Sequence, residues 1–220
     1  MNFHINFSRR NRKRSMEPSR SLPSLRKPLI KLHRDLLVIE GFVRWNVFDP
    51  FLSDFEKIVL ILEDRRFLSH GGVDIKACAR EIFKCFLGRR HGGASTIDMQ
   101  FVRTATGYRE LTLRRKLYEI LLSVLIQYRY SKIQILRSYL DCAFFGSGMI
   151  GIHRATNWMY EKAPVALDKN EAARLAAMLV YPRPLAPDDI WERRVDRRAE
   201  YGLRRMLRFE KLFEKIPSGE

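Results

Sequence analysis

The sequence predicts a mainly α domain, on three observations. After about residue 34, apolar residues recur at helical spacing nearly throughout. No stretch alternates apolar and polar residues with a period of two, the pattern of a half-buried strand. Glycines cluster at 71–72, 92–93 and 146–151, where they would separate successive helices. The 220 residues, 46% of them hydrophobic, are enough for one core of ordinary size.

Capping residues predict where these helices begin and end. Serine, threonine and aspartate accept hydrogen bonds from the free N–H groups of a first turn, and glycine readily adopts the left-handed conformation that ends a helix. The expected helices run from Ser53 to about Asp64, from Asp74 to Gly88, from Ser95 to Gly107, from Thr112 through Glu119, from Ser131, from Asp168, and from about Ile190 to Lys215. Three starts resemble capping boxes: Ser95 with Asp98, Ser131 with Gln134, and Asp168 with Glu171.

Positive charge is concentrated at the N-terminus. The formal net charge is +16, and residues 1–34 hold ten Lys or Arg and one acid. Their Ser, Pro and Arg content predicts a basic, disordered arm, followed by a helical domain over 35–220. The arm is either a solvated tail or a clamp on anionic lipid. We expect an anionic partner, but not nucleic acid, because the arm offers only Phe3 and Phe7 for base stacking.

The three cysteines, Cys78, Cys85 and Cys142, predict neither a disulfide framework nor a zinc site, because their number is odd and no CxxC pair is present. We expect them to be small core residues. No uncharged run reaches the roughly 18 residues that span a bilayer, and Arg, Lys and Pro interrupt the region where a secretory apolar segment would stand. Neither a transmembrane helix nor a signal peptide is therefore expected.

The segment "KLYEILLSVLIQYR", residues 116–129, places one carboxylate, Glu119, among apolar residues. On a helical wheel, one apolar stripe contains Leu113, Leu117, Leu121, Val124 and Leu125, while Leu122 and Ile126 lie on the other side, where Glu119 also falls. A helix that is apolar on both sides is expected to be central. Burying an unpaired carboxylate is costly, so Glu119 is either a structural ion-pair partner, for example of Lys116, or a site carboxylate facing a cleft.

A second pair of acids follows the apolar run Ile58 to Leu62. Glu63 and Asp64 stand at the C-terminal end of a helix expected to be buried, against its dipole. That position favours the protonated carboxyl, which suits a base that works near neutral pH. The alternative is that both acids merely pair with Arg65 and Arg66 at the surface.

A third segment, "RRHGGASTIDMQFVR", resembles an anion site. Paired glycines before a capped helix expose backbone N–H groups at the positive helix end. Arg89 and Arg90 precede the glycines, and Arg103 lies two turns into the helix. The alternative is a simple turn with a cap.

In this order, the segments resemble the peptidoglycan glycosyltransferases, also called transglycosylases (glycosyltransferase family 51), from about residue 55 to 206. Five blocks carry the resemblance: "EDRRFLSHGGVD" (63–74), "GGASTIDMQFVR" (92–103), "RKLYE" (115–119), "KIQILRSYLDCAFFGSGMIG" (132–151) and "EAARLAAMLVYPRPLAP" (171–187). The family patterns are EDxxFxxHxGxD, GGSTITQQLxK, RKxxE, KxxILxxYLNxxxFGxGxxG and EAAxLAxxxxxPxxxxP. Any one block is weak, but five in order are specific.

The resemblance implies a lysozyme-like helical domain with two lobes around a long active-site cleft. It also implies that Glu63 and Glu119 are the two active-site glutamates, with Glu63 as the general base on the acceptor hydroxyl. The leaving diphosphate then needs cations and hydrogen-bonding groups, for which the candidates are Ser95, Gln100, Arg103, Arg115 and Lys116. The sequence requires no cofactor, and the resemblance allows a divalent metal, Mg²⁺ or Mn²⁺.

The sequence departs from the family pattern at several positions. The family's TQQ reads Asp98–Met99–Gln100, its lysine is Arg103, and its YLN asparagine is Asp141. The family's YFGK reads Met159–Tyr160–Glu161–Lys162. Leu111 stands where the family often has an arginine, and Arg109 or Arg114 could supply the missing guanidinium. We therefore expect a divergent, monofunctional member without a transpeptidase domain.

The expected activity is the polymerisation of lipid II-like polyprenyl-diphosphate disaccharides into β-1,4 glycan strands with inversion. By resemblance, the protein would act peripherally on the outer, periplasmic face of the cytoplasmic membrane, with cell-wall synthesis proteins as further partners. Helix 73–90 would touch the membrane through Ile82, Phe83 and Phe86, unless it is an ordinary core helix. The alternatives are an inactive module that binds lipid-linked glycan, a nucleic-acid-binding protein and a lysozyme-like hydrolase.

Overall fold

The computed structural model describes residues 25–45, 49–86 and 95–213, except the side chains of Ile82, Cys85, Phe86 and residues 209–213. The helices are α1 (Arg26–Glu40), α2 (Asp54–Glu63), α3 (Ile75–Phe86), α4 (Ile97–Thr106), α5 (Leu113–Gln127), α6 (Lys132–Cys142), α7 (Ile152–Tyr160), α8 (Lys169–Ala177) and α9 (Asp189–Phe213), with 3₁₀ turns η1 (Phe67–Ser69) and η2 (Pro164–Ala166). The mainly α prediction is confirmed.

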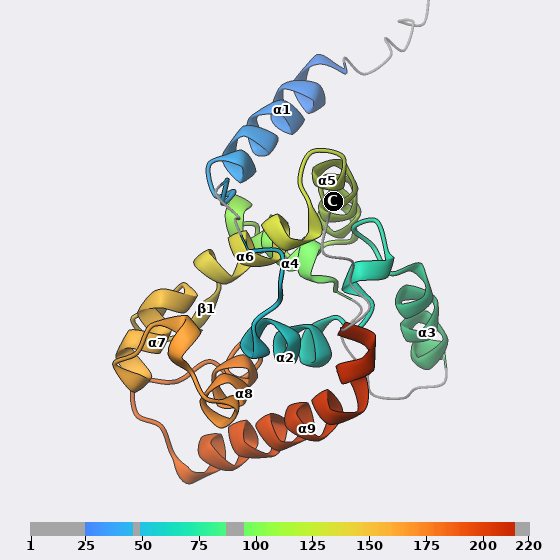
Figure 1. The fold of residues 1–220 in the computed structure, drawn as a ribbon. Coiled ribbons are helices and arrows are strands. Elements are labelled where there is room, and N and C mark those ends of the chain that lie inside the picture. The colour runs from blue at the N-terminus through green and yellow to red at the C-terminus, as the bar shows by residue number, and fades with distance from the viewer. Residues whose placement is uncertain (1–24, 46–48, 87–94, 214–220) are drawn as a thin grey trace, which may run out of the picture.

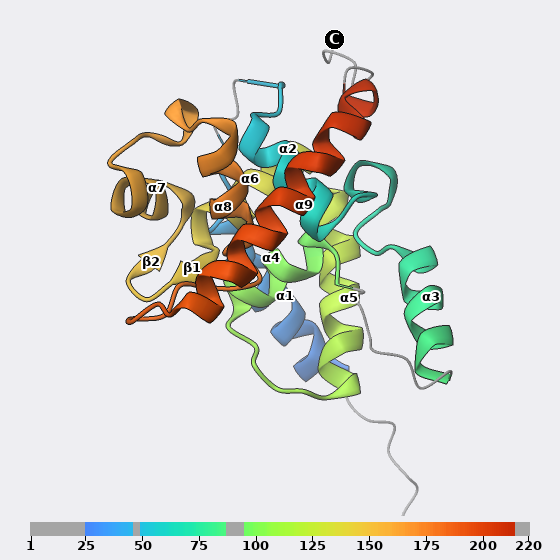
Figure 2. The same cartoon turned by 90° about the horizontal axis from the view of Figure 1, so that it is seen from below.

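The helices form two groups (Figures 1 and 2). Helices α2, α8 and α9 pack on one another, and α4 packs against α5, α6 and α1. Helix α3 stands at the edge of the molecule. This arrangement agrees with the predicted two-lobed helical domain.

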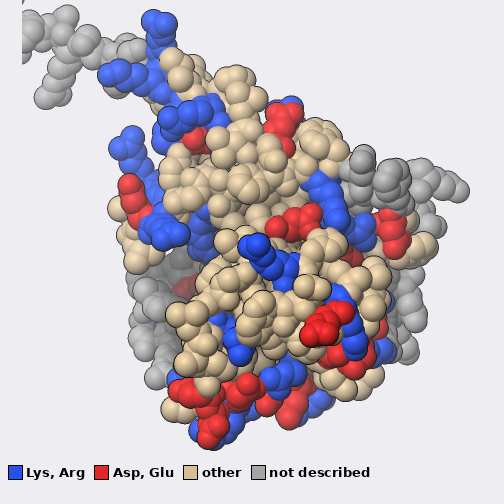
Figure 3. Space-filling model, turned by 90° about the vertical axis from the view of Figure 1, so that its left-hand side faces the viewer, with Lys and Arg blue, Asp and Glu red and all other residues tan. Residues whose placement is uncertain are grey.

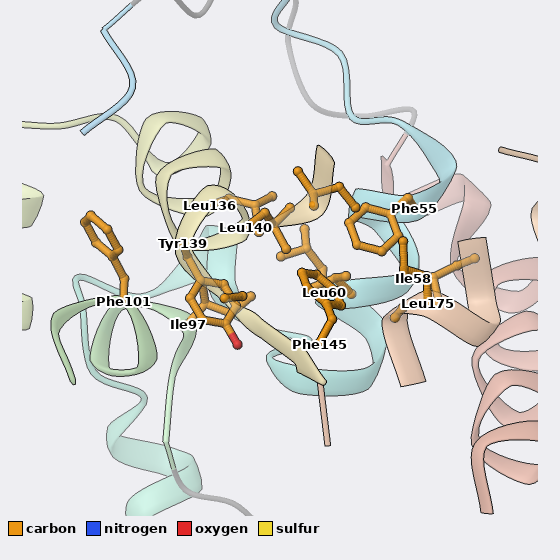
Figure 4. Packing of buried hydrophobic residues seen from close by; sticks show 14 of the residues in the cluster. Phe55, Ile58, Leu60, Ile97, Phe101, Leu136, Tyr139, Leu140, Phe145 and Leu175 are labelled. Carbon is orange, nitrogen blue, oxygen red and sulfur yellow. The ribbon is translucent and has the colours of Figure 1, made fainter. Parts of the chain in front are cut away.

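One cluster of buried apolar side chains connects the two groups (Figure 4). It includes Phe55 and Ile58 from α2, Phe101 from α4, Leu136 from α6 and Leu175 from α8. Cys142 lies in this core as expected, while Cys78 is only half-buried and the side chain of Cys85 lies outside the described part.

The helix starts follow the capping residues closely. Complete capping boxes are present at Ser53, at Ser131 with Gln134, and at Asp168 with Glu171. Thr112 accepts a hydrogen bond from the backbone N–H of Arg115, and Gly107 ends α4 in the left-handed conformation. These predictions depend only on residues within four positions of each other, and the structure confirms them.

The predicted capping box at Ser95 and Asp98 is wrong. The cap of α4 is Thr96, whose buried hydroxyl oxygen accepts the N–H of Met99 at 3.2 Å and donates to the carbonyl of Gly72 at 2.7 Å. Thr96 makes both bonds because it packs against the η1–α3 connection, a contact that the local pattern does not contain. Ser95 is thereby left to bind another partner.

The sequence analysis predicted that α5 is central, because the helix is apolar on two sides. That prediction is wrong. Leu113, Leu117 and Leu121 are 76%, 58% and 45% exposed, whereas Leu122 and Ile126 are fully buried. The buried side is the one that carries Glu119 and Ser123. An apolar surface along α5 therefore faces outward.

Helix α1 corrects the boundary predicted for the arm, because residues 26–34, expected to be disordered, are helical. Residues 1–24 lie outside the described part. Lys and Arg side chains gather on α1 in the upper part of Figure 3, whereas acids and bases mix along the lower edge, near α9. Among the described helices, none combines the length and apolar character that a membrane span requires.

A short hairpin was missed by the sequence analysis. Strand β1 (Phe144–Gly146) pairs antiparallel with β2 (Met149–Ile150). Five residues in strands are too few for a period of two to be recognised.

We predict that Gly72→Ala lowers the free energy of unfolding by about 2–4 kcal/mol, because Gly72 has φ = +89° and an added Cβ would lie 2.4 Å from the carbonyl oxygen of Ser123. The control is Gly71→Ala, where an added Cβ meets nothing within 4 Å; it should change stability by less than about 0.5 kcal/mol. Urea denaturation measures both, and equal stabilities of the two variants would contradict the prediction.

Candidate active site

Glu63 lies at the C-terminal end of α2, where Arg198 and Gln100 contact its carboxylate. Its side chain is 10% exposed, and Oε1 accepts a hydrogen bond from Arg198 Nη2 of α9 at 2.7 Å. Arg198 also donates to the carbonyl of Leu62 at 3.0 Å, and Gln100 Nε2 lies 3.4 Å from Oε2. The guanidinium thus lies beside both the carboxylate and the negative end of α2, a contact that the expectation from the helix dipole did not include.

Arg198 was missed because its charged helix resembled a solvated one. A signal was present, however: Val195, Ala199, Gly202 and Met206 recur at helical spacing, and Val195, Ala199 and Met206 are buried. Gly202 lies against Ile58 and Leu62 of α2. Arg198 stands one turn from Val195, which brings it to the C-terminal end of α2. The alternative pairing of Glu63 with Arg65 or Arg66 does not occur, and Arg66 pairs with Asp74 at 3.0 Å.

Glu119 is 1% exposed and pairs with two cations of its own helix. Arg115 Nη1 donates to Oε1 at 2.5 Å, and Lys116 Nζ lies 3.6 Å from Oε2. Oε2 accepts no hydrogen bond from any described residue. Burial lowers the pKa of Lys116 against the opposing effect of Glu119. The ion-pair interpretation of Glu119 is therefore confirmed, and it is compatible with a role in a site.

Helix α4 connects the two glutamates. Gln100 lies between Glu63 and Tyr139, whose hydroxyl donates to Gln100 Oε1 at 2.6 Å. At the start of α4, Ser95 Oγ accepts a hydrogen bond from Lys116 Nζ at 3.0 Å. Arg103, one turn after Gln100, is close enough to oppose the charge on Lys116. The structure thus brings Gln100 to Glu63, and Ser95 and Arg103 to the cations beside Glu119.

An open pocket of about 380 Å³ lies beside Arg103. Arg103, Arg109 and Arg115 line it together with Thr104, Gly107, Tyr108 and Leu111, without any acid among the described lining residues. Arg103 and Arg109 make no ion pair with any described residue. Arg115 pairs with Glu119, but Arg103 and Arg109 have no acidic partner among the described residues, and guanidinium groups gathered in this way are typical of a site for a multiply charged anion. We call these residues the arginine pocket. Arg114 does not line it, so Arg109 is the better substitute for the family arginine at the position of Leu111.

Asp98 belongs to a different, buried polar cluster. Lys132 Nζ lies 3.2 Å from its Oδ2, His70 Nδ1 lies 3.9 Å from the same oxygen, and Gln127 donates to Oδ1. His70 Nε2 in turn lies 3.0 Å from Asp64, which also accepts the backbone N–H of Ile97. Burial raises the pKa of Asp98, and Lys132 opposes this effect. The cluster ties α4 to α6 and to the η1 turn, away from the arginine pocket.

This cluster does not fit a divalent metal. Asp64, His70 and Asp98 are the one group of such side chains in the described ranges that comes close enough to ligate an ion. Lys132 already supplies a positive charge at Asp98, and the three side chains are at most 5% exposed. Mg²⁺ keeps several water ligands, which a buried cluster of this kind does not accommodate. We assign no catalytic step to a metal.

Several predicted residues lie elsewhere. Arg89, Arg90 and the glycines 92–93 of the expected anion loop are outside the described residues. Phe83 is 65% exposed, which rules out the core alternative for this side chain, while the side chains of Ile82 and Phe86 are not described.

Comparison with known proteins decides the family. The model of the transglycosylase family matches residues 44–207. The chain belongs to this family. A biosynthetic peptidoglycan transglycosylase of Thiobacillus denitrificans is 32% identical over 64% of this chain and 61% of its own length. That of Shewanella frigidimarina is 32% identical over 66% of this chain and 65% of its length.

Larger relatives match the chain as well. Penicillin-binding protein 1A of Rickettsia prowazekii is 35% identical over 66% of this chain but only 19% of its own length. The transglycosylase chain thus covers less than two thirds of each of these relatives. One departure from the family pattern has a visible cost, because Glu161 adopts φ = +54° where the family has glycine.

We predict that Lys132→Met lowers the free energy of unfolding by about 3–5 kcal/mol, because it leaves Asp98 buried without its cation. Adding Asp98→Thr, which removes the charge, should restore most of the loss. As a control, Lys162→Met breaks the partly exposed pair with Glu171 and should cost less than about 1 kcal/mol. Urea unfolding measures all three, and a double variant as unstable as Lys132→Met would refute the prediction.

Proposed function

We propose that this transglycosylase polymerises lipid II-type polyprenyl-diphosphate disaccharides into β-1,4 glycan strands with inversion at the anomeric carbon. The observation that carries the proposal is the position of α4, which lies between a framed carboxylate, Glu63, and an arginine pocket beside Glu119. A nucleophile and a diphosphate leaving group need a base and a cationic site of this kind. The relatives named above support the substrate class.

In the proposed reaction, the acceptor's sugar 4-hydroxyl attacks the anomeric carbon of the donor. The new C–O bond forms as the bond to the diphosphate oxygen breaks, and the hydroxyl proton passes to Glu63. Arg198 and Gln100 contact the two carboxylate oxygens of Glu63 and fix the orientation of its side chain. A general base must be held within hydrogen-bonding reach of the proton it accepts, and these contacts supply that orientation.

The leaving diphosphate would be bound in the arginine pocket. Arg103 and Arg109 have no competing acid among the described residues, and Arg115 lies between the pocket and Glu119. Lys116 with Ser95 would complete the site. In this arrangement Glu119 holds Arg115 and Lys116 in place and does not itself transfer a proton.

The membrane contact is part of the proposal. Phe83 and Ile75 are exposed on α3 together with Lys76 and Arg80, a mixture typical of a helix at a bilayer surface. The leucines exposed on α5, Leu113, Leu117 and Leu121, would add apolar surface to this contact. We accordingly propose a peripheral position on the outer face of the cytoplasmic membrane, with other cell-wall synthesis proteins as partners.

The second candidate is an inactive module that binds lipid-linked glycan. Its support is the replacement of the family's TQ by Asp98 and Met99, and of an arginine by Leu111. Against it, Asp98 and Met99 are buried and do not line the pocket, and Arg109 lines the pocket beside Leu111 and supplies a guanidinium there. The test is incubation of the protein with labelled lipid II: polymer supports polymerisation, shortening of preformed glycan indicates a hydrolase, and binding without turnover favours the inactive module.

We predict that Glu63→Gln lowers turnover about 10²–10⁴-fold, the usual contribution of a general base, without loss of lipid II binding. Glu119→Gln should lower both turnover and thermal stability, because it removes the buried charge with which Arg115 and Lys116 pair. Polymerisation rates and melting curves separate the two effects. Glu192→Gln is the control, since Glu192 pairs with Arg174 at 2.6 Å on a partly exposed part of α9 and contacts neither glutamate. Near-normal turnover of Glu63→Gln would contradict the mechanism.

We predict that Phe83→Asp weakens binding to phosphatidylglycerol vesicles about tenfold, the worth of one apolar side chain, without changing the melting temperature. The matched control is Leu207→Asp on α9, since Leu207 is 71% exposed and Phe83 is 65% exposed. Vesicle sedimentation measures both, and an equal loss in the two variants, or unfolding of Phe83→Asp, would contradict the proposed surface.

A further inference from the structure

Asp35 is a buried carboxylate on α1, outside the segment matched by the family model. Its Oδ2 atom accepts hydrogen bonds from Lys31 Nζ at 2.7 Å, from Tyr108 at 2.5 Å and from Tyr118 at 2.9 Å. The Lys31 ammonium lies over both tyrosine rings, 4.2 and 4.0 Å from their centroids. We call these four residues the Asp35 cluster. It is a built polar site that no step proposed so far uses.

The two tyrosines stand on the elements that carry the arginine pocket. Tyr108 lines the pocket and precedes Arg109 in the loop between α4 and α5. Tyr118 is one turn after Arg115 on α5. The Asp35 cluster therefore connects α1 to both walls of the arginine pocket.

The loop that carries Arg109 needs such an attachment. Arg109 and Arg103 are exposed, lack ion-pair partners among the described residues, and repel each other and Arg115 across the pocket. Without a restraint, Arg109 would lower its energy by turning into solvent. Tyr108 supplies the restraint, because its hydroxyl is bonded to a buried carboxylate that would be costly to leave unpaired.

The charge state of Asp35 agrees with a strong restraint. Burial works to raise the pKa of Asp35, but the hydrogen bonds from Lys31, Tyr108 and Tyr118 outweigh it and hold the pKa below its ordinary value. Hydrogen bonds to an ionised acceptor are about twice as strong as bonds between neutral groups. The hydrogen bonds of the Asp35 cluster are therefore strong enough to hold Tyr108 against α1.

We propose that Asp35 and Tyr108 are positioning residues, which hold the 107–111 loop so that Arg109 stands in the arginine pocket and binds the substrate's diphosphate. This inference rests on the function proposed above, in which the pocket takes the diphosphate. It makes α1 part of the binding site, although α1 contributes no pocket-lining residue.

The test compares two tyrosine variants with the same chemical change and the same acceptor. Tyr108→Phe releases the loop, whereas Tyr118→Phe removes a bond to Asp35 from α5 and leaves the loop attached. Affinity of the full chain for undecaprenyl diphosphate in detergent is measured by calorimetry. We expect Tyr108→Phe and Arg109→Ala each to weaken binding about tenfold, the worth of a hydrogen bond to a charged group, and Tyr118→Phe to change it less than about twofold.

The double variant Tyr108→Phe with Arg109→Ala distinguishes positioning from mere structural support. If Tyr108 acts through Arg109, the double variant binds as weakly as Arg109→Ala alone. Additive losses, equal losses in both tyrosine variants, or unchanged binding by Tyr108→Phe would overturn the inference. If Arg103→Ala and Arg109→Ala both keep full affinity, the pocket does not bind the diphosphate, and the proposed function loses its leaving-group site. If these two variants lose affinity while Tyr108→Phe does not, only the positioning role of Tyr108 fails.

Discussion

The ion pair between Glu63 and Arg198 joins the last helix of the domain to the C-terminal end of α2, 135 positions earlier in the chain. Arg198 meets three demands at once: it neutralises a largely buried carboxylate, it binds the free carbonyl of Leu62, and it fixes the carboxylate's orientation. A carboxylate at that helix end without a cation would be destabilised by burial and by the helix dipole. The packing of α9 along α2, through Gly202 against Ile58 and Leu62, is what brings the guanidinium there.

Buried carboxylates recur through the domain, and each is paired with a cation or a set of donors. Glu119 has Arg115 and Lys116, Asp98 has Lys132, and Asp35 has Lys31 and two tyrosines. Removing one partner from such a pair costs more than the pair contributes, because the other charge stays buried. Several of these contacts join different helices: Tyr118 joins α5 to α1, Lys132 joins α6 to α4, and Arg198 joins α9 to α2.

The arginine pocket is the exception to this pairing. Arg103 and Arg109 have no acid beside them in the described structure, and their mutual repulsion opposes folding until an anion binds. Binding sites commonly contain such destabilising charge, because cations that are already neutralised by acids of the protein attract an anionic substrate only weakly. Beside these arginines, α5 exposes Leu113, Leu117 and Leu121 to solvent, so an apolar surface without a packing partner accompanies the cations. A substrate with a diphosphate and a polyprenyl chain has the chemistry that would match both.

Local features of the sequence determined the helix starts and the family. The boxes at Ser53, Ser131 and Asp168, and the left-handed Gly107, depend on residues within one turn, so they could be predicted without the fold. The block containing Glu63 and the block containing Glu119 identified the candidate carboxylates for the same reason. What those carboxylates contact was decided by tertiary structure. Arg198 reaches Glu63, Thr96 replaces Ser95 as a cap, and α5 buries the side with Glu119, because helices far apart in the chain pack there. Helical periodicity specifies which residues share a face but not which partner covers that face, and an ion pair across the domain leaves no mark in local spacing.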